Sequence, residues 1–244
     1  MNDLTPSQRI LCALDTTDPQ VAFDLAEKLR DHVGGVKLGL EYFGACGPAG
    51  FDHVAQSGMP IFLDLKLHDI PNTVAKAISA LMPLRPHIMT IHTSGGAAMM
   101  TAAAQAATEA AKNVDGNNIN YVRPIIVGVT ILTSMDDSDL RDVGLSPPVE
   151  SQVVRMARLA KKSGLDGVVC SPFEITALRE ACGPDFKLIV PGIRPIGSSK
   201  GDQKRTMTPR EAIERGADYI VIGRPITEAD DPIKAAQDIA RELE

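Results

Sequence analysis

The stretch "PIFLDLKLHDIPNTV", residues 60–74, joins a short apolar run to a Pro-initiated helical pattern and carries three charged side chains within six positions. An apolar run of this length followed by a helix is typical of a β-strand that enters a β/α unit. Side chains alternate along a strand, so Asp64 and Lys66 share one face. The opposite face carries Leu63, Leu65 and Leu67. We expect the leucines to pack against helices and the charged pair to point into the interior of the sheet.

Seven further apolar runs resemble residues 60–67, and each is bounded by Gly, Pro or Asp and is too short for a typical helix. These predicted strands are residues 9–15, 35–40, 88–93, 123–130, 166–172, 186–193 and 219–226. Helical patterns lie between them, which requires parallel strands with crossover connections. Eight such units in 244 residues predict an α/β fold, a (β/α)8 TIM barrel formed by one domain, residues 1–244. An open doubly wound sheet is the alternative, but no G-x-G-x-x-G follows the first strand.

The chain shows no linker or shift in composition that would divide it into domains. Two polar stretches, residues 113–120 and 133–150, are predicted as loops within the single domain.

The bulk composition excludes several classes of function. The net charge of −6 argues against a nucleic-acid partner, because phosphate binding needs clustered Lys and Arg. No apolar run approaches the roughly 18 residues that span a bilayer, so we expect no membrane association. The N-terminal "MNDLTPSQRI" has neither the basic nor the apolar region of a secretory signal, and the four cysteines show no C-x-x-C spacing. These features predict a cytoplasmic protein.

Charged residues collect at the ends of the first three predicted strands. Asp15 closes the first strand, Lys37 lies in the second, and Asp64, Lys66 and Asp69 lie in or just after the third. Active sites of TIM barrels lie at these C-terminal ends. Each residue taken singly also fits a structural ion pair, but five charges at one barrel mouth are costly to desolvate and are typical of a functional site. A Lys between carboxylates stays protonated, which predicts that Lys66 is a proton donor or cationic stabiliser and not a Schiff-base nucleophile.

The ends of the last two predicted strands have the features of a phosphate site. Gly192 and Gly223 allow backbone N–H groups to approach an anion closely, and Arg194 and Arg224 supply forked hydrogen bonds. Phosphate sites of TIM barrels commonly form after strands seven and eight. The Gly-, Ser- and Lys-rich stretch 197–206 is predicted as a mobile lid, with a simple surface loop as the alternative. These features predict a phosphorylated small molecule as substrate.

The motif "DLKLHDIPNT" resembles the signature of the orotidine 5'-phosphate decarboxylase family, in its bacterial monofunctional form. Further motifs support the resemblance in the order that the family has them: "ALD", "VKLG", "VTILTS", "VPGIRP", "DQKR" and "IGRPI". The resemblance implies decarboxylation of orotidine 5'-phosphate, a phosphorylated pyrimidine nucleotide, to UMP and carbon dioxide. This reaction is the last step of de novo pyrimidine nucleotide synthesis. The resemblance also implies that the enzyme uses no cofactor and no metal.

The resemblance further implies a role for each charged residue of the first three strands. Lys66 donates the proton, Asp64 lies beside the substrate carboxylate, and Asp69 belongs to the same catalytic network. Asp15 and Lys37 hold the ribose hydroxyls, and Lys37 is also part of the charged network.

The remaining implied contacts reach the rest of the nucleotide and a second subunit. Asp69 and Thr73 extend into the neighbouring site of a homodimer with shared active sites, and Thr133 contacts the pyrimidine. The phosphate is received by Arg194, Gln203, Gly223 and Arg224.

Two other functions fit parts of the pattern. A related Mg-dependent sugar-phosphate decarboxylase or aldolase of the same barrel superfamily uses a similar strand, and it would need extra carboxylate ligands and be sensitive to EDTA. A non-catalytic nucleotide-binding barrel would bind UMP but leave orotidine 5'-phosphate unchanged.

Overall fold

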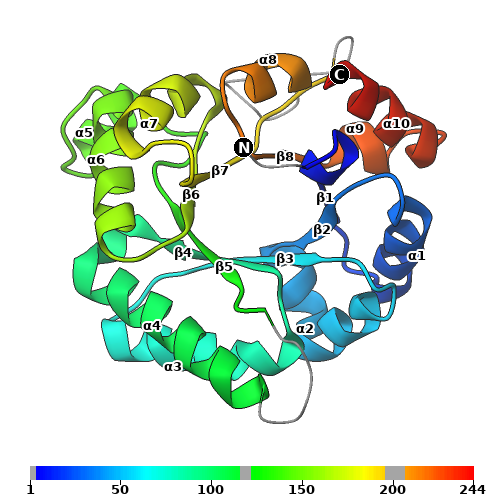
Figure 1. Ribbon diagram of the computed structural model, residues 1–244, viewed down its shortest axis with the longest axis horizontal. Coiled ribbons are helices and arrows are strands. Elements are labelled where there is room, and N and C mark those ends of the chain that lie inside the picture. Colours follow the sequence, from blue (N-terminus) through cyan, green and yellow to red (C-terminus); the bar gives the residue numbers. More distant parts are fainter. Residues whose placement is uncertain (1–3, 116–121, 196–206) are drawn as a thin grey trace.

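The computed structural model describes residues 4–115, 122–195 and 207–244. Eight parallel strands form a closed barrel in chain order, and β1 pairs with both β2 and β8 (Figure 1). The strands are β1 Ile10–Ala13, β2 Gly35–Leu38, β3 Ile61–Leu67, β4 Ile88–His92, β5 Ile125–Val129, β6 Gly167–Val169, β7 Lys187–Val190 and β8 Tyr219–Ile222. The prediction of a (β/α)8 barrel is therefore confirmed.

Helices form a ring around the barrel (Figure 1). They are α1 Pro19–Leu29, α2 Leu40–Ala55, α3 Pro71–Leu81, α4 Gly96–Asp115, α5 Asp137–Asp142, α6 Val149–Lys162, α7 Ile175–Cys182, α8 Pro209–Glu214, α9 Arg224–Thr227 and α10 Pro232–Glu242. Short 3-10 helices cover Ser7–Arg9, Met82–Leu84, Thr93–Gly95 and Pro172–Glu174. The start of α1 shows how the sequence sets a boundary: the Asp18 carboxylate accepts the Gln20 N–H at 2.8 Å, and Pro19 takes the first helical position.

Two apolar clusters build the core. The smaller one fills the barrel interior and contains Leu11, Ala13, Phe62, Ile88, Val127, Ile189, Tyr219 and Val221. The larger one lies between the strands and the helices, where Leu63 is buried and Leu65 and Leu67 pack against it. The predicted facing of β3 is thus confirmed, because its leucines meet the helices and Phe62 lies inside the barrel.

Several strands are shorter than predicted, and two polar stretches contain helix. β7 ends at Val190, since Pro191 has no N–H to continue a ladder. The predicted run 219–226 is wrong at its end, because Arg224–Thr227 forms α9. The predicted loop 133–150 contains α5, which begins with a capping box between Asp136 and Asp139. In the predicted loop 113–120, α4 continues to Asp115, and the remainder lies outside the described residues.

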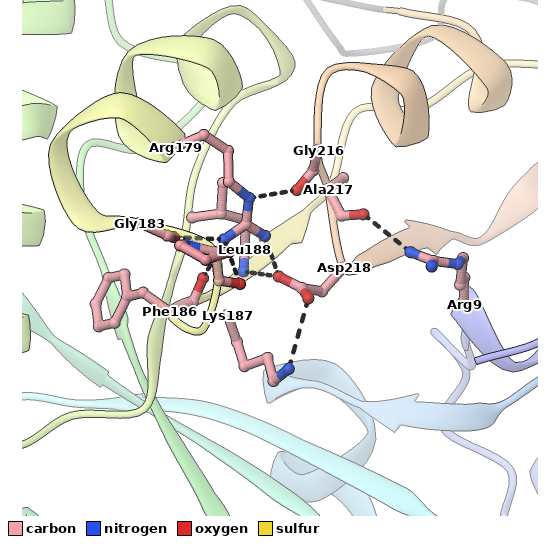
Figure 2. Close-up of polar contacts among 10 residues, drawn as sticks. Arg9, Arg179, Gly183, Phe186, Lys187, Leu188, Gly216, Ala217 and Asp218 are labelled. Atoms are coloured by element: carbon pink, nitrogen blue, oxygen red, sulfur yellow. Dashed lines mark hydrogen bonds and ion pairs between the residues drawn. The ribbon is translucent and has the colours of Figure 1, made fainter. Parts of the chain in front are cut away.

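A polar cluster connects α7 to the N-terminal ends of β7 and β8 (Figure 2). The Arg179 guanidinium, from α7, donates to Gly216 O at 2.7 Å and Phe186 O at 2.6 Å, and pairs with the Asp218 carboxylate. Asp218 also accepts the Leu188 N–H at 2.9 Å, although it is only 5% exposed. These contacts join α7 and the segments that enter β7 and β8, at the opposite end of the barrel from the C-terminal strand ends.

Candidate active site

Four charged side chains form a row of alternating sign at the C-terminal ends of β1, β2 and β3. Lys66 Nζ lies 2.8 Å from Asp64 Oδ2, and Lys37 Nζ lies 3.7 Å from the same oxygen. Lys37 Nζ also lies 3.4 Å from Asp15 Oδ1. Each ammonium therefore faces a carboxylate, and the mutual attraction offsets the cost of removing these charges from water. The structure brings together Asp15, Lys37, Asp64 and Lys66 at one end of the barrel.

The row runs from the rim of the barrel into its interior. The Asp15 side chain is 57% exposed, whereas those of Lys37 and Asp64 are 13% and 11% exposed. Lys66 is intermediate at 28%. The rim carboxylate is thus open to a solvent-borne ligand, while the buried pair lies where electrostatic interactions are less screened by water.

The backbone at Lys66 departs from a regular strand. Its φ of 52° lies in the left-handed region, and the pairing of β3 with β4 shifts register between Leu63 and Leu67. Such a conformation costs a non-glycine residue about 1–3 kcal/mol and is concentrated at functional sites. The Lys66 N–H donates to Thr90 Oγ1 at 2.8 Å, and this hydroxyl donates to Asp64 Oδ1 at 3.0 Å. Sequence reasoning missed Thr90; its signal is a polar residue between apolar neighbours at an interior-facing position of the strand "IMTIH".

A cavity of about 180 Å³ adjoins the charged row. Lys37, Asp64, Lys66 and Thr133 line it, and the contact of Thr133 with a pyrimidine stays a prediction. The other walls are largely apolar and include Phe62, Val129, Ile131, Val169, Pro191 and Val221. An apolar pocket with a few convergent charges is the usual form of a small-molecule site.

His92 lies at the end of β4, beside this site. Its ring centroid is 5.5 Å from that of His68. Burial lowers the pKa of His92, and electrostatic interactions with His68 and Lys66 lower it further, whereas Asp64 acts in the opposite direction. His92 therefore favours its neutral form next to the ammonium of Lys66.

Asp69 and Thr73 lie outside the cavity. Asp69 is exposed after β3, and its Oδ1 accepts the Ile70 N–H at 2.7 Å. Within the described part of the chain its carboxylate forms no ion pair, so one chain alone does not bring it to Lys66. Thr73 is exposed in the first turn of α3.

Three of the predicted phosphate residues, Arg194, Gly223 and Arg224, follow β7 or β8 at the same end of the barrel as the charged row. Gly223 comes directly after β8, and Arg224 begins α9 with an exposed side chain. Arg194 follows β7, where its guanidinium donates to Ile193 O at 2.8 Å and its backbone N–H donates to Met207 O at 3.0 Å. Gln203 and the whole of the predicted lid, residues 197–206, lie outside the described residues.

Among residues 4–115, 122–195 and 207–244, no group of three or more His, Cys, Asp or Glu is placed to hold a metal ion. Over these same ranges, no helix has the length and apolar character needed to cross a bilayer.

Comparison with known proteins connects this geometry to a family. Residues 8–239 match the family model described as "Orotidine 5'-phosphate decarboxylase / HUMPS family". The chain belongs to this family. It is 55% identical over 235 residues to the orotidine 5'-phosphate decarboxylase of Paramagnetospirillum magneticum, covering 96% of this chain and 97% of that one. It is 50% identical over 237 residues to the orotidine 5'-phosphate decarboxylase of Moorella thermoacetica, covering 97% and 92%.

A solved crystal structure of an orotidine 5'-phosphate decarboxylase is also similar to this chain. The crystal structure of orotidine 5'-phosphate decarboxylase from Lactobacillus acidophilus superimposes with a TM-score of 0.82 at 38% identity, covering 96% of this chain and 98% of that one. The resemblance drawn from the sequence motifs is therefore confirmed.

Proposed function

We propose that this protein decarboxylates orotidine 5'-phosphate to UMP and carbon dioxide. Membership of the family and the names of its curated relatives support the reaction. The observation that carries the proposal is the Lys66 ammonium, which lines the cavity and is paired with Asp64 at 2.8 Å. This reaction needs a fixed positive charge at the reacting carbon, and Lys66 supplies one.

The reaction replaces the carboxylate at C6 of the pyrimidine with a proton. Departure of carbon dioxide leaves an electron pair in an in-plane orbital that the ring delocalises poorly. An ammonium already fixed by Asp64 stabilises this charge without reorganisation. Lys66 then transfers a proton to C6, which forms the new C–H bond, and the amine takes up a proton from solvent. Asp64, next to the departing carboxylate, also raises the energy of the bound substrate.

The other predicted residues would bind the nucleotide away from C6. Asp15 and Lys37 hold the ribose hydroxyls, and Thr133 contacts the pyrimidine. The phosphate is bound by Arg194, Gln203, Gly223 and Arg224. Three of these four phosphate residues follow β7 and β8, which supports their assignment. Binding energy from the phosphate is then available to orient the reacting carbon.

We further propose a homodimer in which Asp69 and Thr73 complete the partner's site. Support comes from the exposure of Asp69 and of neighbouring apolar side chains: Ile70 is 66% exposed, and Leu40, after the adjacent strand, is 60% exposed. Mixing inactive Lys66→Ala and Asp69→Ala proteins tests this, because exchange of subunits would rebuild one intact site. Recovery of turnover on mixing supports shared sites, and absence of recovery after verified subunit exchange contradicts them.

The proposed reaction is tested by following the ultraviolet absorbance of orotidine 5'-phosphate with purified protein, with and without EDTA. We expect conversion to UMP at the same rate in both. Rate loss with EDTA that Mg²⁺ restores would indicate the Mg-dependent sugar-phosphate class of the same superfamily. UMP binding without any turnover would indicate a nucleotide-binding barrel.

We also propose that the protein acts in the cytoplasm, because its four free cysteines suit a reducing compartment.

A further inference from the structure

We propose that Thr90 is a positioning residue for the decarboxylation, acting through both Lys66 and Asp64. Its hydroxyl connects the backbone of Lys66 to the carboxylate of Asp64 and so fixes where the ammonium lies. The inference rests on the proposed function of this site, and it concerns a residue of β4 that does not line the cavity.

The hydrogen bonds of Thr90 show that its hydroxyl is an acceptor toward Lys66 and a donor toward Asp64. Thr90 Oγ1 accepts the Lys66 N–H at 2.8 Å, and a backbone N–H has no other role than donor. The single hydroxyl proton is then available for Asp64 Oδ1, which lies 3.0 Å away. Thr90 is 1% exposed, so deletion of its hydroxyl leaves both partners with little access to replacement water.

The contact with Lys66 supports a strained backbone. Lys66 adopts a φ of 52° where β3 and β4 change register, between Leu63 and Leu67. A left-handed residue persists only when its surroundings over-determine it. Thr90 holds this irregular segment at two points, the N–H of Lys66 and the side chain of Asp64. The conformation that directs the Lys66 side chain into the cavity therefore depends on a hydroxyl from the neighbouring strand.

Because Thr90 contacts Asp64, the two oxygens of the carboxylate have different partners. Oδ1 accepts from Thr90, whereas Oδ2 faces the Lys66 and Lys37 ammoniums at 2.8 Å and 3.7 Å. Without the bond at Oδ1 the carboxylate is held through Oδ2 alone, so its orientation is less tightly fixed. Loss of the hydroxyl is thus expected to loosen the row of charges without removing any charge.

The test deletes the hydroxyl and then restores it. In Thr90→Val we expect kcat to fall about 10- to 100-fold, because a hydrogen bond to a charged group is lost. KM for orotidine 5'-phosphate and Kd for UMP should stay within about threefold, since no ligand contact is removed. Thr90→Ser keeps the hydroxyl and should retain kcat within about threefold of wild type. Should Thr90→Val not fold, Thr90→Ala deletes the same hydroxyl in a smaller side chain, and the same outcomes apply.

The matched control is Thr93→Val. Thr93 follows β4, is also 1% exposed, and donates its hydroxyl to Val129 O at 2.8 Å, so it loses a similarly buried bond that does not touch the charged row. We expect its kcat to stay near wild type. An unchanged kcat in Thr90→Val, an equal loss in Thr93→Val, or no rescue by Thr90→Ser would each overturn the proposal.

A crystal structure of Thr90→Val separates this inference from the proposed function. We expect Lys66 Nζ to move away from Asp64 Oδ2 or the left-handed backbone at Lys66 to relax. Unchanged geometry at both would overturn the role of Thr90 even if kcat falls. Absence of turnover in the wild-type protein would contradict the proposed function, and the crystal structure would still decide whether Thr90 positions the ammonium.

Discussion

The Lys37 ammonium lies 3.7 Å from Asp64 Oδ2, although the two residues come from neighbouring strands. The space that the ammonium occupies depends on Gly39. A Cβ added at Gly39 would lie only 2.9 Å from Lys37 Nζ. The absence of a side chain at position 39 therefore helps to set the middle of the charged row.

Gly39→Ala is expected to displace the Lys37 ammonium and to leave the fold intact. The φ of −95° at Gly39 suits alanine, and the end of a flexible lysine moves easily, so the melting temperature should change little. We expect kcat/KM for orotidine 5'-phosphate to fall by about tenfold, as a misplaced charge stabilises the transition state less well. Gly44→Ala is the control, because a Cβ there meets nothing within 4 Å. Wild-type kinetics in Gly39→Ala would show that the position of Lys37 is not critical.

Arg224→Ala tests the proposed phosphate contact. Loss of a charge-assisted hydrogen bond should raise KM about 10- to 100-fold, with a smaller effect on kcat. Arg30→Ala serves as the control, since Arg30 is an exposed arginine directly after α1, paired with Glu27. The measurement is the steady-state kinetics of Arg224→Ala. An unchanged KM together with an unchanged kcat/KM would contradict phosphate binding by Arg224.

The Arg179–Asp218 cluster is expected to stabilise the fold without affecting catalysis. In Arg179→Met the Asp218 carboxylate, with a side chain 6% exposed, loses its guanidinium partner and keeps the more distant Lys187 ammonium at 3.6 Å. Breaking a buried pair in this way costs about 3–5 kcal/mol of unfolding free energy, measurable by urea denaturation. The exposed pair of Arg241 and Asp238 provides the contrast, because Arg241→Ala should cost under about 1 kcal/mol. Equal losses in the two variants would mean that burial does not decide the contribution of the Arg179 pair.

His92 is expected to make the stability depend on pH. Burial lowers its pKa in the folded protein, so the unfolded chain, with a pKa of about 6.5, takes up this proton first as the pH falls. The protonation of His92 therefore does not change the free energy of unfolding above about pH 6.5, and it lowers this free energy at more acidic pH. Urea denaturation between about pH 7.5 and 5.5 should therefore show declining stability, with a shallower decline in His92→Asn. Identical slopes for both proteins would contradict this assignment.

The sequence predicted those parts of the fold and the site that depend on local pattern. Alternation along residues 60–67 placed Asp64 and Lys66 inside the barrel, and the order of apolar runs predicted its closure. The left-handed conformation of Lys66 was missed, since "DLKL" is also the pattern of a regular strand. That conformation and the bonds to Thr90 arise from the pairing of β3 with β4, a contact between residues 24 positions apart.

Helix α5 was missed for a different reason. Its sequence, "DSDLRD", is short and polar, and only Leu140 is buried, so it lacks the apolar periodicity that predicts a helix. The start of α5 is marked instead by the capping box of Asp136 and Asp139. Its polar residues are also common in loops, so composition alone does not reveal the helix. The place of Asp69 beside Lys66 depends on a second subunit in our proposal, and one chain alone does not specify it.

The most direct test of the central claim is the activity of Lys66→Ala together with its affinity for UMP. In our proposal the fixed ammonium of Lys66 stabilises the carbanion and supplies its proton. We predict a kcat at least about 10³-fold below wild type, with a Kd for UMP within about tenfold. Turnover near the wild-type rate in a correctly folded Lys66→Ala protein would contradict the account.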